Sequence, residues 1–177
     1  MNKPLVGILM GSDSDLPVMQ EAAQVLEAFG IGYEVHTLSA HRTPEVVVEY
    51  IQKSEADGYK VFICGAGGAA HLAGVVAAHT ALPVIGVPMM AAKMGAAGVD
   101  SLFSTVQMPP GIPVATVGIG SAKNAGILAA QIIGAGDMGV RAKIVAYKEK
   151  MAGDIVAKDD SLQEKGFKKY LEEQGLI

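Results

Sequence analysis

The sequence predicts a three-layer α/β/α sandwich built on a five-stranded parallel sheet, followed by a C-terminal helical extension. Five short apolar runs of strand length alternate with helix-length segments, and loops that contain glycine or serine join them. Strands that are apolar throughout are typical of sheets covered on both faces, and right-handed crossovers then give a doubly wound fold. Hydrophobic residues make up 50% of the chain and aromatic residues only 5%, so we expect a core of aliphatic side chains.

Most of the predicted elements have a boundary signal in the sequence. The strands are expected at 5–10, 33–38, 60–64, 83–87 and 114–119. The helices are expected at 18–29, 44–58, 69–80, 99–106 and 121–133. Gly30 ends the first helical pattern, Thr43 is placed to cap the second helix, and Pro44 would occupy its first position.

The composition changes near Asp137. Residues 1–136 contain 6 Lys or Arg and 10 Asp or Glu, whereas residues 137–177 contain 8 of each. One helical stripe in the second part is apolar and comprises Val140, Ile144, Tyr147, Met151 and Ile155. We therefore predict a main domain at 1–136 and a helical extension at 137–177. The extension would pack on its own domain or on a neighbouring subunit, and a solvated charged helix is the alternative.

Charge and composition exclude several classes of protein. A net charge of −4, with no basic face in the first three quarters of the chain, argues against a general nucleic-acid binder. No apolar run reaches the roughly 18–20 residues of a membrane span. Cys64 is the only cysteine, which favours a reducing cytoplasm. Metal-ligand spacing and a Walker A sequence are both absent from the sequence, so we expect neither a metal nor ATP use.

The loop Ser39–Pro44 follows the second predicted strand and carries the most informative side chains. Arg42 can hold a phosphate or a carboxylate through two parallel hydrogen bonds. His41 lies beside it, and an imidazole exchanges protons near neutral pH. Because ligands of doubly wound sheets bind beyond the carboxyl ends of the strands, this loop is a candidate site. An accidental His–Arg pair is the alternative.

Two further loops lie at the same predicted edge. Gly11–Asp15 could be only a helix cap, but it has more hydroxyl and carboxylate groups than a cap needs. Ser12 could hold a phosphate and Asp15 could hold ribose hydroxyls. Gly65–Ala70 formally matches a dinucleotide-binding pattern, although it follows the third strand and lacks the acidic residue about 20 positions later. Its small residues suit an anion near a helix N-terminus or, alternatively, tight strand–helix packing.

These loops together resemble the aminoimidazole ribonucleotide carboxylase family, class I, whose members are N5-carboxyaminoimidazole ribonucleotide mutases. The matching motifs cover nearly all of residues 4–136 and are Gly11–Asp15, Ser39–Pro44, Gly65–Leu72, Gly86–Pro88, Asp100–Leu102, Val106–Val114, Asn124–Ala125 and Leu128–Ile132. The resemblance implies a flavodoxin-like fold and a homo-octamer. It also implies conversion of N5-carboxyaminoimidazole ribonucleotide to 4-carboxy-5-aminoimidazole ribonucleotide, in purine biosynthesis, without a cofactor. An ATP-dependent enzyme that makes the substrate would be the functional partner.

The resemblance also implies roles for single residues. His41 would be the general acid–base. His71 and the loop Gly65–Ala70 would shape the pocket for the migrating carboxylate. The residues expected to bind the substrate are Ser12, Asp15, Ser39, Arg42, Gly67, Gly68, Ala69, His71 and Leu72.

Other functions remain open at this level. A class II enzyme would carboxylate aminoimidazole ribonucleotide directly with CO2, but the combination of His41–Pro44 with Gly67–His71 favours class I. A flavin- or nucleotide-binding module without chemistry and an interaction protein are further alternatives. Two stretches depart from the family pattern: Met89–Met94, where a serine is expected, and Gly120–Lys123, which is about two residues short.

Overall fold

The computed structural model describes residues 3–90 and 97–177. Contacts between residues divide the chain into two compact units, Met1–Arg141 and Ala142–Ile177. The first unit contains the sheet and five of the α-helices, and the second contains most of the long helix α6 together with α7. Of the unusual stretch Met89–Met94, residues 91–94 lie outside the described residues.

The sheet of the first unit has five parallel strands in the order β2-β1-β3-β4-β5. The strands are β1 (Pro4–Met10), β2 (Gly32–Thr37), β3 (Val61–Gly67), β4 (Val84–Met89) and β5 (Ala115–Thr116). The register pairs Ile8 of β1 with Val35 of β2 and with Ile63 of β3. This is the flavodoxin-like order, and the predicted fold class is therefore confirmed. The order reverses between β1 and β3, where such folds bind their ligands.

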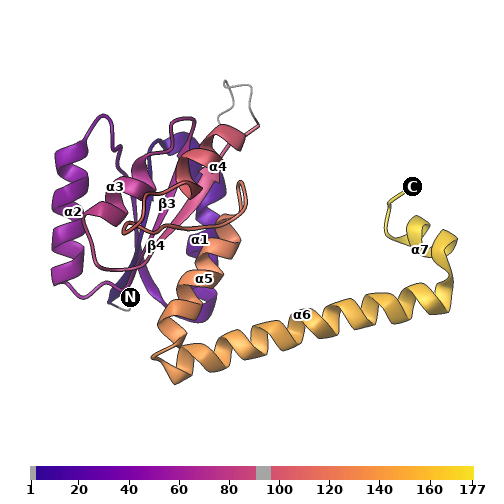
Figure 1. Cartoon of the computed structure of the whole chain (residues 1–177). Helices are drawn as coiled ribbons and strands as arrows, with labels where there is room; N and C mark the ends of the chain where they lie inside the picture. Colours follow the sequence, from indigo (N-terminus) through magenta and orange to yellow (C-terminus); the bar gives the residue numbers. More distant parts are fainter. Residues whose placement is uncertain (1–2, 91–96) are drawn as a thin grey trace. The chain divides into compact units, whose positions relative to one another are not determined.

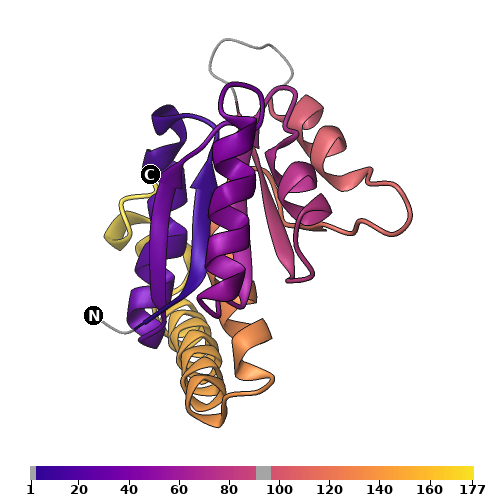
Figure 2. The same cartoon turned by 90° about the vertical axis from the view of Figure 1, so that its left-hand side faces the viewer.

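Helices cover both faces of the sheet (Figures 1 and 2). The helices of this unit are α1 (Leu16–Phe29), α2 (Pro44–Ala56), α3 (Leu72–Ala78), α4 (Val99–Val106) and α5 (Ala122–Gly134), with a 3-10 turn at Asp13–Asp15. Helices α1 and α5 pack against each other on one face. Helices α3 and α4 lie on the other, since a side chain added at Gly86 would meet both Ala73 of α3 and Thr105 of α4. Helix α2 contacts α3 on this face.

The core is aliphatic, as the composition predicts. The largest fully buried side chains come mainly from β1, β3 and α1, and Phe62 is the only aromatic one among them. Burying one Leu, Ile, Met or Val side chain contributes roughly 1.5–3 kcal/mol. Glycine permits one close approach, because the backbone of Ala22 in α1 lies 2.8 Å from where a Cβ of Gly126 would stand. The core thus fixes the sheet whose strand ends carry the loops.

Three predicted details are corrected. Helix α3 begins at Leu72 and not near residue 69, because β3 continues through Gly67 and Gly68 turns the chain with φ 62°. The fifth strand is only Ala115–Thr116 and not 114–119, because a turn follows in which Gly120 has φ 68°.

The third correction concerns Thr43. It precedes α2 as expected, but its side chain does not cap the helix. Its hydroxyl accepts from the Ser39 N–H at 3.0 Å and donates to the Ser39 carbonyl at 3.1 Å. Thr43 therefore closes the loop that carries His41 and Arg42.

The second unit is helical. Helix α6 (Met138–Lys165) and helix α7 (Phe167–Glu173) are separated by Gly166, whose φ is 75°. An ion pair of 2.5 Å joins Lys165 to Glu173 across this break. Within the described residues, helices long and apolar enough to cross a membrane are absent.

Candidate active site

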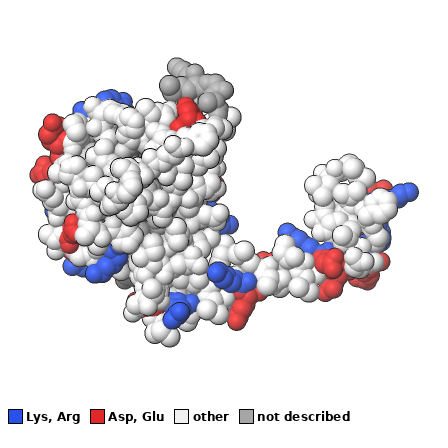
Figure 3. All heavy atoms as spheres, in the orientation of Figure 1, with Lys and Arg blue, Asp and Glu red and all other residues white. Residues whose placement is uncertain are grey.

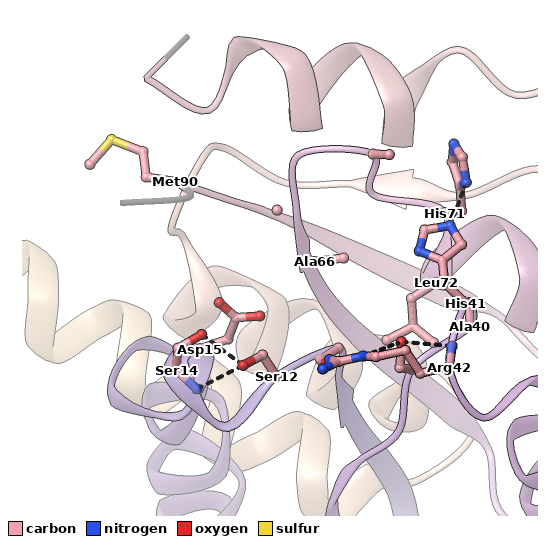
Figure 4. Close-up of a pocket in the computed structure, with 14 residues that line it drawn as sticks. Ser12, Ser14, Asp15, Ala40, His41, Arg42, Ala66, His71, Leu72 and Met90 are labelled. Carbon is pink, nitrogen blue, oxygen red and sulfur yellow. Dashed lines mark hydrogen bonds between the residues drawn. The ribbon is translucent and has the colours of Figure 1, made fainter. Parts of the chain in front are cut away.

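A cavity of about 610 Å³ lies at the carboxyl ends of β1, β2, β3 and β4 (Figure 4). Ligand sites of small molecules typically have about 300–1,000 Å³. Four segments, each at the end of one of these strands or just after it, contribute the lining: Gly11, Ser12, Ser14, Asp15, Ser39, Ala40, His41, Arg42, Ala66, Gly67, Ala69, His71, Leu72 and Met90. The cavity therefore lies beside the point, between β1 and β3, at which the strand order reverses.

The structure brings together all but one of the site residues predicted from the sequence. Those that line the cavity are Ser12, Asp15, Ser39, His41, Arg42, Gly67, Ala69, His71 and Leu72. Gly68 is not part of the lining. It is buried, and its positive φ shapes the turn between β3 and α3.

Arg42 is held in place by its own loop and by the end of β1. Its Nη2 donates to the Gly11 carbonyl at 2.5 Å, and its Nε donates to Ser39 Oγ at 3.3 Å. The same hydroxyl accepts from the backbone N–H of Arg42 at 3.3 Å. The guanidinium is thereby directed toward the turn that contains Ser12 (Figure 4).

The turn after β1 concentrates oxygen atoms. Ser12 Oγ accepts from the Ser14 N–H at 3.3 Å and from Ser14 Oγ at 2.9 Å, and it donates to Asp13 Oδ1 at 3.2 Å. Ser12 therefore caps the 3-10 turn, one of the two roles that the sequence predicts for this loop. Burial, and to a lesser extent the neighbouring Asp13 carboxylate, raises the pKa of Asp15 above its ordinary value.

Two imidazoles meet at the cavity. Nε2 of His41 and Nδ1 of His71 are 2.8 Å apart, and the two rings stand edge to face with centroids 4.9 Å apart. One ring nitrogen must donate and the other must accept, so the hydrogen bond fixes the orientation of both rings. His41 comes from the loop after β2, and His71 immediately precedes α3.

Small and apolar residues complete the walls. Ala40, Ala66, Ala69, Leu72 and Met90 contribute no polar side chain. The predicted site residues did not include Gly11, Ser14, Ala40, Ala66 or Met90. The sequence could have indicated the first four of these residues, because each lies inside one of the three loops predicted to form the site. Met90 follows β4, whose end carries no polar motif.

The remaining histidines lie outside the lining. His36 is on the edge strand β2, where its ring packs on Tyr50 with a centroid distance of 4.4 Å and its Nε2 lies 3.3 Å from Glu34. His79 follows α3, and its Nδ1 lies 2.8 Å from the Val75 carbonyl. Both histidines therefore have contacts of a structural kind, with a neighbouring side chain or a backbone carbonyl. Among the described residues, groups of three or more His, Cys, Asp or Glu that could hold a metal are absent.

The cavity thus combines two kinds of chemistry. A guanidinium and several hydroxyls can hold an anion, while an imidazole pair can give and take a proton. The nearby apolar walls leave part of the cavity with few hydrogen-bond donors or acceptors. This set suits a phosphorylated metabolite that undergoes proton transfer.

Comparisons with known proteins agree with this description. The model of the AIR carboxylase family matches residues 5–154. The chain is 54% identical to the N5-carboxyaminoimidazole ribonucleotide mutase of Thermotoga maritima over 171 residues, which is 97% of this chain and 99% of the relative. It is also 54% identical to the protein of that name from Pyrococcus horikoshii, with 97% and 96% covered.

Solved structures support the same relationship. The crystal structure of Treponema denticola PurE superposes with a TM-score of 0.79 and 36% identity, covering 90% of this chain and 98% of that one. The family resemblance expected from the loop motifs is therefore confirmed. Because the family model matches residues 5–154 and the identity to relatives extends over 97% of the chain, this protein belongs to the AIR carboxylase family.

Proposed function

We propose that this protein is an N5-carboxyaminoimidazole ribonucleotide mutase, which moves a carboxylate from N5 to C4 of the aminoimidazole ring in purine biosynthesis. The observation that carries this proposal is the hydrogen-bonded pair His41–His71 in the same cavity as Arg42. Relatives that are 54% identical over nearly the whole chain have this name.

The anionic end of the substrate would lie at Arg42. Two N–H groups of its guanidinium are already bonded to Ser39 and Gly11, so three of its five remain for phosphate oxygens. The hydroxyls of Ser12 and Ser39 would complete this end, and Asp15 would accept hydrogen bonds from ribose hydroxyls. Gly67, Ala69, His71 and Leu72 would then enclose the ring and its carboxylate.

The reaction needs no external oxidant, reductant or energy source. The aminoimidazole ring is an enamine, so its C4 is a carbon nucleophile. The N5–carboxyl bond breaks, CO2 leaves, and N5 takes a proton from the His41 imidazolium. C4 then attacks the same CO2, and the neutral imidazole removes the C4 proton. One imidazole thus gives one proton and recovers one, a role worth about 10²–10⁴ in rate.

The walls would keep CO2 near the ring between the two steps. Ala66, Ala69 and Leu72 offer CO2 no nucleophile, and a closed site prevents its loss to water. Among the described lining residues there is no Phe, Tyr or Trp on which a flavin ring could stack. This composition favours the mutase over a flavin-binding module.

The decisive experiment supplies the N5-carboxy nucleotide to the purified protein in bicarbonate-free buffer and follows the absorbance of the 4-carboxy product. Product formation is expected. Product that appears only from aminoimidazole ribonucleotide with added bicarbonate would instead identify a direct carboxylase.

His41→Asn should abolish turnover and retain nucleotide binding, while His36→Asn, outside the cavity, serves as the matched control. Full activity of His41→Asn would remove this residue from the mechanism.

Assembly and location complete the proposal. We infer a homo-octamer in which the extension at 137–177 packs on a neighbouring subunit, because Met151 and Ile155 of the predicted apolar stripe are exposed in the single chain. We also infer a cytoplasmic protein supplied by an ATP-dependent enzyme that carboxylates N5. The free, buried thiol of Cys64 supports a reducing compartment. Sedimentation velocity tests the octamer, and a strictly monomeric protein would contradict it.

A further inference from the structure

The loop between β2 and α2 presents its two functional side chains where packing cannot hold them. His41 and Arg42 are exposed to solvent, whereas Ser39 and Thr43 at the ends of the loop are partly buried. Among the described residues, Arg42 forms no ion pair. Figure 3 shows a largely uncharged surface at the upper end of the first unit, where the strands finish. The directions of both side chains must therefore come largely from hydrogen bonds.

Thr43 supplies the hydrogen bonds that join the two ends of this loop. Its Oγ1 accepts from the Ser39 N–H at 3.0 Å and donates to the Ser39 carbonyl at 3.1 Å. The Thr43 N–H donates to the same carbonyl at 2.8 Å. Three hydrogen bonds thus connect two residues. The chain between these residues, which includes His41 and Arg42, is held as a closed turn.

The hydroxyl of Thr43 serves the loop and not the helix that follows. Threonine is a preferred N-cap residue, because its hydroxyl can accept from the free N–H groups of the first helical turn. Thr43 precedes α2 without forming such a bond. Strand β2 ends at Thr37, so strand pairing does not satisfy the backbone groups of Ser39. A local preference of helices is set aside here, and such exceptions are typical of functional sites.

The turn closed by Thr43 also carries the contacts of the two functional side chains. Ser39 Oγ accepts from the backbone N–H and from Nε of Arg42, both at 3.3 Å, so a shift of Ser39 would move the guanidinium. His41 belongs to the same turn, and its Nε2 lies 2.8 Å from Nδ1 of His71. Figure 4 shows Arg42 extending toward Ser12 while His41 lies beside His71. One loop conformation therefore sets both contacts.

We propose that Thr43 is a positioning residue, whose hydroxyl aligns both the imidazole that transfers protons and the guanidinium that binds the phosphate. Thr43 does not line the cavity, so it acts through His41 and Arg42. This inference rests on the proposed function, because it assigns Thr43 to the same reaction. Without the hydroxyl the loop would adopt conformations in which neither group is aligned. A displacement of about 1 Å in an active site can cost roughly 10²-fold in rate.

The test compares two substitutions in the full-length protein. Thr43→Val removes the hydroxyl and keeps the branched side chain, whereas Thr43→Ser keeps the hydroxyl. Steady-state kinetics of Thr43→Val should show kcat about 10-fold lower and KM about 10-fold higher. Thr43→Ser should remain close to the wild type. If Thr43→Ser is as impaired as Thr43→Val, the methyl group and not the hydroxyl is responsible, and the proposal is wrong.

Thr80→Val is the matched control. The Thr80 hydroxyl likewise accepts from a backbone N–H, that of Leu82 at 3.0 Å, and it donates to Glu55 at 3.2 Å. None of these three residues lines the cavity. Thr80→Val therefore removes a comparable pair of bonds at a distance from the site and should leave kcat and KM unchanged. A loss as large as that of Thr43→Val would show that any such deletion harms the enzyme, against the proposal.

A double variant separates positioning from a simple loss of folded protein. A smaller folded fraction lowers kcat and leaves KM as it was, so the rise in KM is diagnostic. In an Arg42→Ala background Thr43→Val should raise KM much less, because the guanidinium that it aligns is gone, while kcat should still fall through His41. An equal KM in wild type and Thr43→Val, or an undiminished rise in the Arg42→Ala background, would overturn the proposal.

Nitrogen NMR of isotope-labelled histidine rings gives a readout that needs no turnover. The hydrogen bond between His41 and His71 determines which nitrogen of each ring carries the proton, so the two nitrogens of a ring give separate signals. In Thr43→Val these signals should move toward the averaged positions of free imidazole, while those of His36 stay in place. Unchanged signals of His41 and His71 would refute the positioning role. A wild type without mutase activity would instead refute the proposed function, and the NMR result would still decide the role of Thr43.

Discussion

Replacing Arg42 by alanine would test the proposed role of its guanidinium, which is to hold the anionic end of the substrate. The side chain is already fixed by Gly11 and Ser39, with Nη2–O and Nε–Oγ distances of 2.5 and 3.3 Å. The three N–H groups that remain can form a parallel pair of bonds to two phosphate oxygens. Because the group is preorganised before the substrate arrives, little side-chain entropy is lost when it binds.

The expected magnitude follows from these bonds. A hydrogen bond to a charged group contributes roughly 1.5–3 kcal/mol, so two such bonds contribute about 3–6 kcal/mol. Arg42 is exposed to solvent, which favours the lower limit because water screens the interaction. A loss of about 3 kcal/mol corresponds to roughly 100-fold weaker binding.

Steady-state kinetics would show whether this loss falls on binding or on the reaction. We expect Arg42→Ala to raise KM about 100-fold with kcat nearly unchanged, since the phosphate is bound equally in ground state and transition state. Arg42→Lys should raise KM by less than Arg42→Ala does, because lysine keeps the positive charge but lacks the planar group that forms two parallel hydrogen bonds. Arg141 is the only other arginine of the chain, and Arg141→Ala is the control. A 100-fold loss of kcat at constant KM would refute the reasoning.

Three further predictions concern stability and reactivity. Gly126→Ala should lower the free energy of unfolding by about 1–3 kcal/mol, since its Cβ would meet the α1 backbone; Gly153→Ala on α6, with open space around it, should not, and equal urea midpoints would contradict this. A hydrogen bond from Tyr59 lowers the pKa of Glu34. The stabilisation that ionised Glu34 gives the fold is therefore present above the ordinary glutamate pKa and is lost as pH falls through the lowered value. Glu34→Gln should reduce the shift in urea midpoint between pH 7 and pH 3, and an unchanged shift would contradict this. Burial raises the pKa of the Cys64 thiol, so a thiol reagent should label it only in denaturant, and rapid labelling of the folded protein would argue otherwise.

The fold was predictable because hydrophobic pattern and turn chemistry agree along most of the first unit. Helix α4 begins and ends at the predicted residues, Val99 and Val106. The errors occur where backbone geometry overrides residue type. The run at 114–119 is apolar enough for a strand, yet pairing with β4 covers only Ala115 and Thr116. Strand β5 lies at the edge of the sheet and has one neighbouring strand, so an apolar sequence alone does not extend it beyond the residues that pair.

The sequence predicted most of the residues that line the cavity but not their geometry. Sequence position places Ser12, Arg42 and His71 at strand ends, and a parallel sheet brings strand ends together. It does not predict that His41 contacts His71, nor that Arg42 binds the Gly11 carbonyl. Those contacts depend on loop conformations set by single residues, such as the positive φ of Gly68. The number and kind of residues in a loop can be read from sequence, whereas the direction of each side chain cannot.

The contact between the two histidines follows from the strand order. Strands β2 and β3 are not neighbours, because each pairs with β1 from opposite sides. Met10 of β1 pairs with Thr37 on one side and with Gly65 on the other, so β1 and β2 end level with each other and β3 continues two residues further, to Gly67. The loops that carry His41 and His71 therefore converge over the end of β1, whose own turn supplies Ser12 and Asp15. A register shift in either pairing would separate the two imidazoles and move the turn that carries Ser12 and Asp15. The proposed proton-transfer pair and the proposed anion site therefore depend on the same strand.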